Sequence, residues 1–151
     1  KSKNLVVEKK SVNLDTILKE TIDNLNFAYP DQLINYSSVE IFIDSDDALL
    51  RLLFKNLIEN AIKYGNNSPV NVILEKGRKI KVIIQDFGLG ISKEALPHIF
   101  ERFYREDEAR NREIKSYGLG LSIVNEILSL LDIDIQVDSE LGKGTKITLE
   151  M

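Results

Sequence analysis

Apolar residues recur at helical spacing between residues 49 and 64, a run without glycine or proline. Side chains three and four positions apart share one face of a helix. The pattern therefore predicts one helix over residues 49–64, with a buried stripe made of Leu50, Phe54, Leu57, Ile58 and Ala61. Asn56, Asn60 and Lys63 fall together on the shoulder of that stripe. A shoulder can line a cleft, although the same stripe taken alone also suits an ordinary surface helix.

Similar patterns predict the other elements of the chain. Helical spacing within residues 11–26 indicates an amphipathic helix that Asn13 or Asp15 can cap. It also indicates a strongly apolar, core-forming helix over residues 121–131. Residues 105–116 are dense in charge with little to bury, which predicts a loop. Alternating or β-branched runs predict strands, which are two short pieces within 33–44, a hairpin over 70–75 and 79–86, and a final hairpin over 133–138 and 146–150.

The mixture of helices and antiparallel hairpins predicts an α/β (α+β) fold. We expect a two-layer α/β sandwich, in which a mixed, mostly antiparallel sheet has helices packed on one face. Strands and helices do not alternate strictly, which argues against a doubly wound parallel sheet. Residues 1–10 are interpreted as a linker or the end of a preceding helix, and residues 11–151 as one domain.

The composition narrows the class of protein. Of the 151 residues, 43% are hydrophobic and 29% are charged, as in an ordinary soluble globular domain. We see no apolar run of membrane length, and the absence of cysteine excludes disulfides and thiolate metal sites. A net charge of -4 argues against general affinity for nucleic acid.

Three glycine clusters mark candidate ligand-binding turns, at residues 86–90, 118–121 and 142–145. Glycine permits close approach of the backbone to a ligand, and Gly118-Leu119-Gly120 is expected to open a helix whose amides could point at an anion. Asp86-Phe87-Gly88 matches the metal-binding triplet of eukaryotic-type protein kinases. That family's other motifs and the P-loop pattern are missing from the sequence.

Five ordered motifs resemble the N, G1, F, G2 and G3 boxes of the catalytic, ATP-binding domain of bacterial sensor histidine kinases, a Bergerat-fold domain related to gyrase, Hsp90 and MutL. They occupy residues 56–64, 86–91, 99–105, 118–124 and 142–145. The resemblance covers residues 13–151. It implies a domain that binds ATP and Mg²⁺ and transfers the γ-phosphoryl group of ATP to a histidine.

The resemblance also implies roles for single residues. Asp86 would accept a hydrogen bond from the adenine amino group, and Thr145 would hold a bridging water beside it. Asn60 would coordinate Mg²⁺, with Asn56 in the same phosphate cavity. Lys63 and Arg105 would contact phosphate, and with Asn56 they are the implied catalytic residues. The remaining implied contacts of ATP are Tyr64, Gly88, Gly90, Ile91, Tyr104, Gly118, Leu119, Gly120 and Leu121.

Asn56 stands where ATP-hydrolysing relatives carry a glutamate, which favours a kinase over an ATPase. Glu59 points about 100° away from Asn60 and is not an obvious substitute. The single histidine, His98, has no acceptor-helix context, so the phosphoacceptor is expected on a separate dimerisation domain of the same protein.

A response regulator is the expected downstream partner, and the cytoplasmic part of an inner-membrane receptor is the expected location. Three alternatives stay open: an ATPase of the wider superfamily, a serine kinase of the anti-sigma-factor type, and a module that acts through protein contacts without nucleotide.

Overall fold

The structure is a computed structural model that describes residues 6–99 and 111–151, with side chains from residue 121 onward in the second range. Five strands form the main sheet in the order β2-β4-β5-β7-β6. Their bounds are β2 Ile34–Ser37, β4 Val70–Lys76, β5 Ile80–Gln85, β6 Asp134–Glu140 and β7 Gly144–Glu150. The β2–β4 pair is parallel and the other three pairs are antiparallel.

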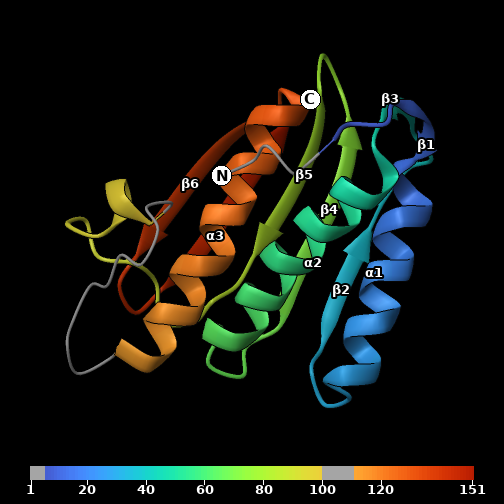
Figure 1. Cartoon of the computed structure of the whole chain (residues 1–151). Helices are drawn as coiled ribbons and strands as arrows, with labels where there is room; N and C mark the ends of the chain where they lie inside the picture. The colour runs from blue at the N-terminus through green and yellow to red at the C-terminus, as the bar shows by residue number, and fades with distance from the viewer. Residues whose placement is uncertain (1–5, 100–110) are drawn as a thin grey trace.

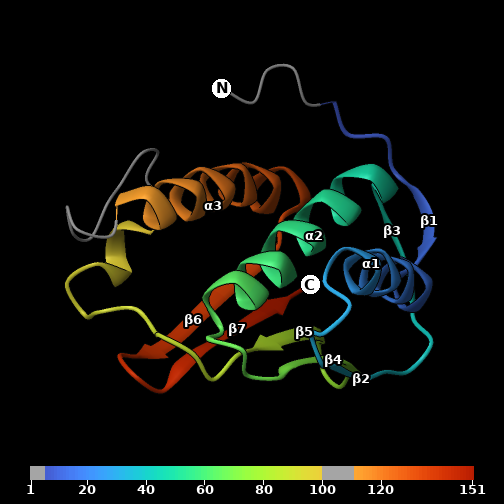
Figure 2. The ribbon, with the colours of Figure 1, turned by 90° about the horizontal axis from the view of Figure 1, so that it is seen from below.

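Three helices cover one face of this sheet: α1 Leu14–Ala28, α2 Asp47–Tyr64 and α3 Asn111–Leu131. Figure 1 shows the helices side by side, with α2 in the middle, and Figure 2 shows that they form one layer over the strands. The predicted two-layer sandwich with a mixed, mostly antiparallel sheet is confirmed, and so are both predicted hairpins.

The core lies between the two layers. Alternate residues of the central strands face the helices and are buried, as β-strand geometry requires: Val70, Val72, Leu74, Val82, Ile84, Ile147 and Leu149. From α2, the predicted stripe is buried, with Leu50, Phe54, Leu57 and Ile58 showing no exposed surface. The helix that carries Asn56 and Asn60 is therefore held rigidly against the sheet.

The start of α2 is fixed by the carboxylate of Asp46, which is 5% exposed. One oxygen accepts a hydrogen bond from the backbone N–H of Leu49 at 2.9 Å, as an N-terminal cap does. The other accepts from the backbone N–H of Glu8 at 2.7 Å. The segment that enters the domain is thus fastened to the first turn of α2.

A second, two-stranded sheet was not expected from the sequence. Strand β1, Lys10–Asn13, pairs antiparallel with β3, Phe42–Ser45. Residues 10–13 therefore belong to the folded domain, and α1 begins after them, with the Asn13 side chain accepting from the N–H of Thr16. Of the two caps that the sequence allows for this helix, Asn13 and Asp15, the structure uses Asn13, because pairing with β3 keeps the chain extended up to that residue.

Helix α3 begins earlier than predicted. The expected loop over residues 105–116 is wrong for residues 111–116, which are helical, and residues 105–110 lie outside the described part of the chain. Gly118, Leu119 and Gly120 consequently lie inside α3 and do not precede its first turn. N–H groups inside a helix bond to carbonyls of the preceding turn. These three cannot act as free anion-binding amides in this conformation. The residues before them are good helix formers, and an interior glycine costs only about 1 kcal/mol relative to alanine.

Candidate nucleotide-binding site

Asp86 follows directly after β5 and is 7% exposed. Its Oδ1 accepts a hydrogen bond from the backbone N–H of Gly88 at 2.9 Å. Burial raises the pKa of the Asp86 carboxyl, while hydrogen bonds from the backbone N–H groups of Gly88 and Thr145 work in the opposite direction. A buried carboxylate supplied with only backbone donors retains the capacity to accept a hydrogen bond from a ligand.

Thr145, at the start of β7, lies beside Asp86. The backbone N–H of Asp86 donates to the carbonyl of Thr145 at 2.9 Å, and the N–H of Thr145 donates to the carbonyl of Asp86 at 3.2 Å. Thr145 is 6% exposed. The two residues that the sequence assigned to base recognition are therefore joined by a pair of backbone hydrogen bonds.

The glycines around Asp86 allow three backbone segments to touch. A Cβ on Gly88 would lie 2.3 Å from the carbonyl oxygen of Tyr64, the last residue of α2. Gly144 has a φ of 108°, and a Cβ there would lie 2.2 Å from the carbonyl oxygen of Asp86. Such distances exclude any side chain, so these glycines have a packing reason in addition to the predicted approach to a ligand.

Ser139, on β6, was missed by the sequence analysis and connects several of the predicted residues. Its hydroxyl oxygen accepts from the backbone N–H of Ile91 at 2.8 Å, lies 3.0 Å from the carbonyl oxygen of Gly144, and lies 2.8 Å from Oγ1 of Thr145. Ser139 and Thr145 are register partners across the β6–β7 hairpin. Counting residues on both sides of the predicted turn could have paired them.

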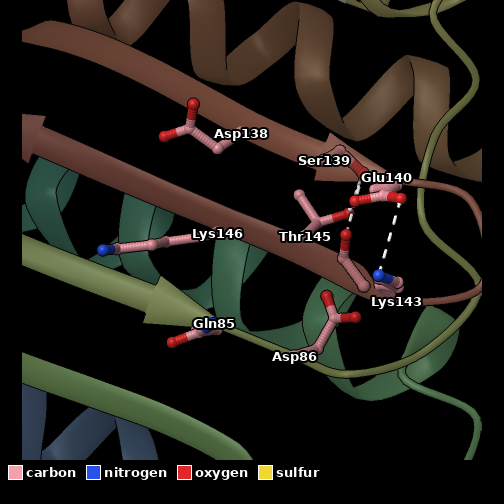
Figure 3. Close-up of a pocket in the computed structure, with 9 residues that line it drawn as sticks. Gln85, Asp86, Asp138, Ser139, Glu140, Lys143, Thr145 and Lys146 are labelled. Carbon is pink, nitrogen blue, oxygen red and sulfur yellow. Dashed lines mark hydrogen bonds and ion pairs between the residues drawn. The ribbon is translucent and has the colours of Figure 1, made fainter.

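A pocket of about 360 Å³ adjoins these groups at the end of the strands (Figure 3). Its lining comes from the end of β5, from β6, from β7 and from the turn between them: Gln85, Asp86, Asp138, Ser139, Glu140, Lys143, Gly144, Thr145 and Lys146. Asn56, Asn60 and Lys63 are not among these lining residues.

The amide-bearing edge of α2 approaches Asp86 from the helix layer. Gly65, just after α2, packs so close that a Cβ on it would lie 3.5 Å from the Cβ of Asp86. In Figure 1 the ends of α2 and β5, the start of α3 and the β6–β7 turn lie at the same end of the molecule. The sheet groups and the α2 groups thus meet at one end of the fold.

The polar groups on α2 differ in their surroundings. Nδ2 of Asn60 is buried and has no hydrogen-bond partner within the described part of the chain. Asn56 is half-buried and donates from Nδ2 to the carbonyl of Leu52 at 2.8 Å, while Lys63 is exposed. An unpaired buried amide costs free energy unless a ligand or water satisfies it, which makes Asn60 a candidate ligand contact.

Glu59 is turned toward α1 and away from this edge. Its carboxylate accepts from the Tyr29 hydroxyl at 2.8 Å and lies 3.5 Å from the ammonium of Lys55. Burial alone would raise the pKa of Glu59, but the hydrogen bond from Tyr29 and the charges of Lys55 and Lys63 bring it below its usual value. Glu59 is therefore an engaged, ionised carboxylate and a poor base, as the sequence analysis expected.

The other predicted residues differ in how far they are buried and in whether the structure describes them. Ile91 and Leu121 are buried, and Tyr64 is half-buried. Tyr104 and Arg105 lie outside the described residues, and Gly118 to Gly120 are described only as helical backbone. His98 is half-buried at the end of a short 3₁₀ helix, Leu96–His98. Ile123, expected in the core, is 41% exposed, whereas Val124 and Ile127 on the same helix are fully buried.

The described residues contain neither a cluster of metal-binding side chains nor a membrane-spanning helix. Among the side chains that the structure describes, in residues 6–99 and 121–151, no three acidic, histidine or cysteine groups gather to hold a metal ion. The amide of Asn60 could share a cation with a ligand that brings its own oxygens, a donor set that suits Mg²⁺ bound to phosphates. None of the helices in the same part of the chain has the length and apolarity to cross a membrane.

Comparison with known proteins extends these observations. Residues 45–151 match the family of histidine kinase-, DNA gyrase B- and HSP90-like ATPases. The chain is 35% identical over 149 residues to the sensor histidine kinase YkoH of Bacillus subtilis (strain 168), covering 97% of this chain and 32% of that protein. It is 36% identical over 112 residues to the sensor protein kinase GraS of Staphylococcus aureus (strain JH1), covering 74% of this chain and 32% of that protein. The chain spans about a third of the length of these relatives.

Solved structures share the fold. The mycobacterial sensor histidine kinase MprB superposes with a TM-score of 0.82 at 21% identity, covering 95% of this chain and 97% of that chain. Full-length ShkA in complex with AMPPNP gives a TM-score of 0.80 at 21% identity, covering 97% of this chain and 31% of that chain. The chain therefore belongs to the family of histidine kinase-, DNA gyrase B- and HSP90-like ATPases, with the sequence and fold of the ATP-binding catalytic domain of a sensor histidine kinase.

Proposed function

We propose that this domain binds ATP together with Mg²⁺ and, within a longer protein, transfers the γ-phosphoryl group to a histidine on a separate dimerisation domain. The observation that carries the proposal is the buried Asp86 carboxylate beside Thr145. A carboxylate held by backbone donors and reached from a pocket suits a base that presents an amino group, as adenine does. The AMPPNP complex of a structural neighbour supports the same ligand class.

The α2 edge would hold the phosphate end of the nucleotide. Asn60 offers a buried amide that lacks a partner, and rotating the amide turns its oxygen toward a cation. When bound there, Mg²⁺ would neutralise charge on the phosphates. Asn56 would line the same cavity, and Lys63 and Arg105 would pair with phosphate oxygens. Tyr64, Ile91 and Tyr104, the turn glycines Gly88 and Gly90, and Leu121 complete the proposed contacts.

The chemistry of Asn56 and Glu59 favours transfer over hydrolysis. Hydrolysis needs a base to activate water. Asn56 is an amide that cannot accept a proton, and Glu59 is held by Tyr29 and Lys55. With neither residue available as a base, ATP is expected to stay unhydrolysed until an acceptor histidine is bound. The domain's own task is then positioning of the phosphate and neutralisation of its charge.

The partners follow from the relatives, which are named sensor kinases. We propose that the acceptor is the dimerisation domain of the same protein, and that an aspartate of a response regulator receives the phosphoryl group next. A membrane receptor with this domain in the cytoplasm is the proposed setting.

The test is a transfer assay. The chain is mixed with γ-labelled ATP, Mg²⁺ and a separately prepared dimerisation domain of the same protein, and the acceptor is examined for label that is stable in base and lost in acid. Asn56→Ala and Asp134→Asn are run in parallel. Asp134 is an exposed carboxylate on β6 outside the proposed site, so Asp134→Asn should transfer as much label to the acceptor as the parent chain does. Steady release of inorganic phosphate without labelled histidine would show an ATPase instead.

A further inference from the structure

The Ser139 hydroxyl sits among three polar atoms beside the proposed adenine contact. Its oxygen accepts from the backbone N–H of Ile91 at 2.8 Å. It also lies 3.0 Å from the carbonyl oxygen of Gly144 and 2.8 Å from Oγ1 of Thr145. Figure 3 shows Ser139 and Thr145 joined across the hairpin, next to Asp86.

Hydrogen counting fixes the direction of these bonds. A serine hydroxyl has one hydrogen to donate and two lone pairs to accept. The carbonyl of Gly144 can only accept, so the contact with it uses the single hydrogen of Ser139. The contact with Thr145 must then use the hydrogen of Thr145, which donates to Ser139. With Ile91 as the second donor, every bonding position of the Ser139 hydroxyl is filled.

We propose that Ser139 is a positioning residue that makes Thr145 an acceptor toward the base and thereby sharpens the preference for adenine. The inference rests on the proposed binding of ATP. Because the hydrogen of Thr145 is spent on Ser139, Oγ1 of Thr145 presents only lone pairs to the pocket. It lies beside the Asp86 carboxylate, which also accepts. The site therefore presents two neighbouring acceptors.

Two acceptors discriminate between purines at one edge. Adenine presents an amino group, whose hydrogens can be accepted directly or through a bridging water. Hypoxanthine, the base of inosine triphosphate (ITP), presents a carbonyl oxygen at the same position. That oxygen would face two acceptors and find no donor, and an unpaired buried polar group is costly. Release of the Thr145 hydrogen would remove part of this penalty, because a threonine hydroxyl can also donate.

The experiment measures dissociation constants for ATP and for ITP, both with Mg²⁺, by calorimetry. The proteins are the parent chain, Ser139→Ala, Ser139→Thr, Thr145→Val, Thr145→Ser and the Ser139→Ala/Thr145→Val double variant. We expect the ATP-over-ITP preference to fall about tenfold in Ser139→Ala, the value of about one hydrogen bond. Ser139→Thr keeps the hydroxyl and should restore the preference. In the Thr145→Val background, Ser139→Ala should change the preference no further.

A purely structural role gives a different result. If Ser139→Ala weakens ATP and ITP by the same factor, Ser139 only supports the loop and the inference is overturned while ATP binding stands. If Ser139→Ala does not fold, the comparison of Thr145→Val with Thr145→Ser decides. An equal ATP-over-ITP preference in these two variants would show that the Thr145 hydroxyl does not contribute to base selection, which overturns the inference. A parent chain that binds neither nucleotide overturns the proposed function, and this inference with it.

Discussion

Replacement of Asp86 by asparagine separates binding of the base from stability of the fold. The carboxylate has two accepting oxygens, and Oδ1 already accepts from the N–H of Gly88. A carboxamide has only one accepting oxygen. If that oxygen serves Gly88, the amide NH₂ faces the adenine amino group. If it serves adenine, the NH₂ faces the N–H of Gly88. Either orientation leaves two donors opposed in a buried site.

The cost of that mismatch sets the expected loss. An unmade hydrogen bond at a buried group costs about 1–3 kcal/mol, which corresponds to about a fivefold to 150-fold weaker affinity for ATP. Calorimetric titration with AMPPNP and Mg²⁺ measures this loss, with Asp134→Asn as the control of equal charge change. Unchanged affinity in Asp86→Asn would refute the assignment of Asp86.

The stability of the fold should not fall in Asp86→Asn, in contrast to its affinity for ATP. The folded pKa of Asp86 is raised, so the folded state binds more protons than the unfolded chain between the ordinary pKa and the raised one. Stability is then lost as pH rises through that window, and the penalty persists at neutral pH. Removal of the charge should leave the urea midpoint of Asp86→Asn at neutral pH unchanged or higher. ATP affinity of the parent chain should fall on acidification through the raised pKa, as protonation removes an acceptor.

Three further substitutions have defined outcomes. Gly88→Ala places a Cβ 2.3 Å from a backbone oxygen and should cost about 1–3 kcal/mol in thermal unfolding, whereas Gly77→Ala meets open space and should stay within about 0.5 kcal/mol of the parent. Phe54→Ala empties a fully buried position and should lower the free energy of unfolding in urea by about 3–5 kcal/mol, and a loss below about 1 kcal/mol would contradict the tight packing of Phe54 in the core. Asn60→Ala should abolish the gain in AMPPNP affinity that Mg²⁺ gives the parent chain, while Asn24→Ala, exposed on α1, should retain it.

Periodicity and turn chemistry were sufficient for the parts of the fold whose signals are local. The helix that became α2 could be predicted because its apolar positions, its Asp46 cap and its closing Gly65 agree. Asp86 could be found because a carboxylate followed by two glycines ends a buried strand. In both places, the local preference of the chain coincides with its tertiary surroundings.

Other features depend on partners far along the chain. Strand β1 carries no useful alternation in its four residues and exists because β3 pairs with it. The first turns of α3 were read as a loop from their charge, although arginine, glutamate and lysine are good helix formers. The role of Ser139 required the hairpin register, which places it opposite Thr145. Local sequence patterns do not encode these long-range pairings.

The two hydrogen bonds of Asp46 join the incoming chain to the first turn of α2. Helix α2 is about 27 Å long at 1.5 Å per residue over its 18 residues. Its first turn shares a carboxylate with the incoming segment at Glu8, and its last turns carry Asn60 and Lys63. A force on the chain ahead of Lys10 would therefore act first on the hydrogen bond between Glu8 and Asp46, at the start of this helix. A domain attached in front of this one would therefore be joined, through Glu8 and Asp46, to the helix that carries the proposed phosphate contacts.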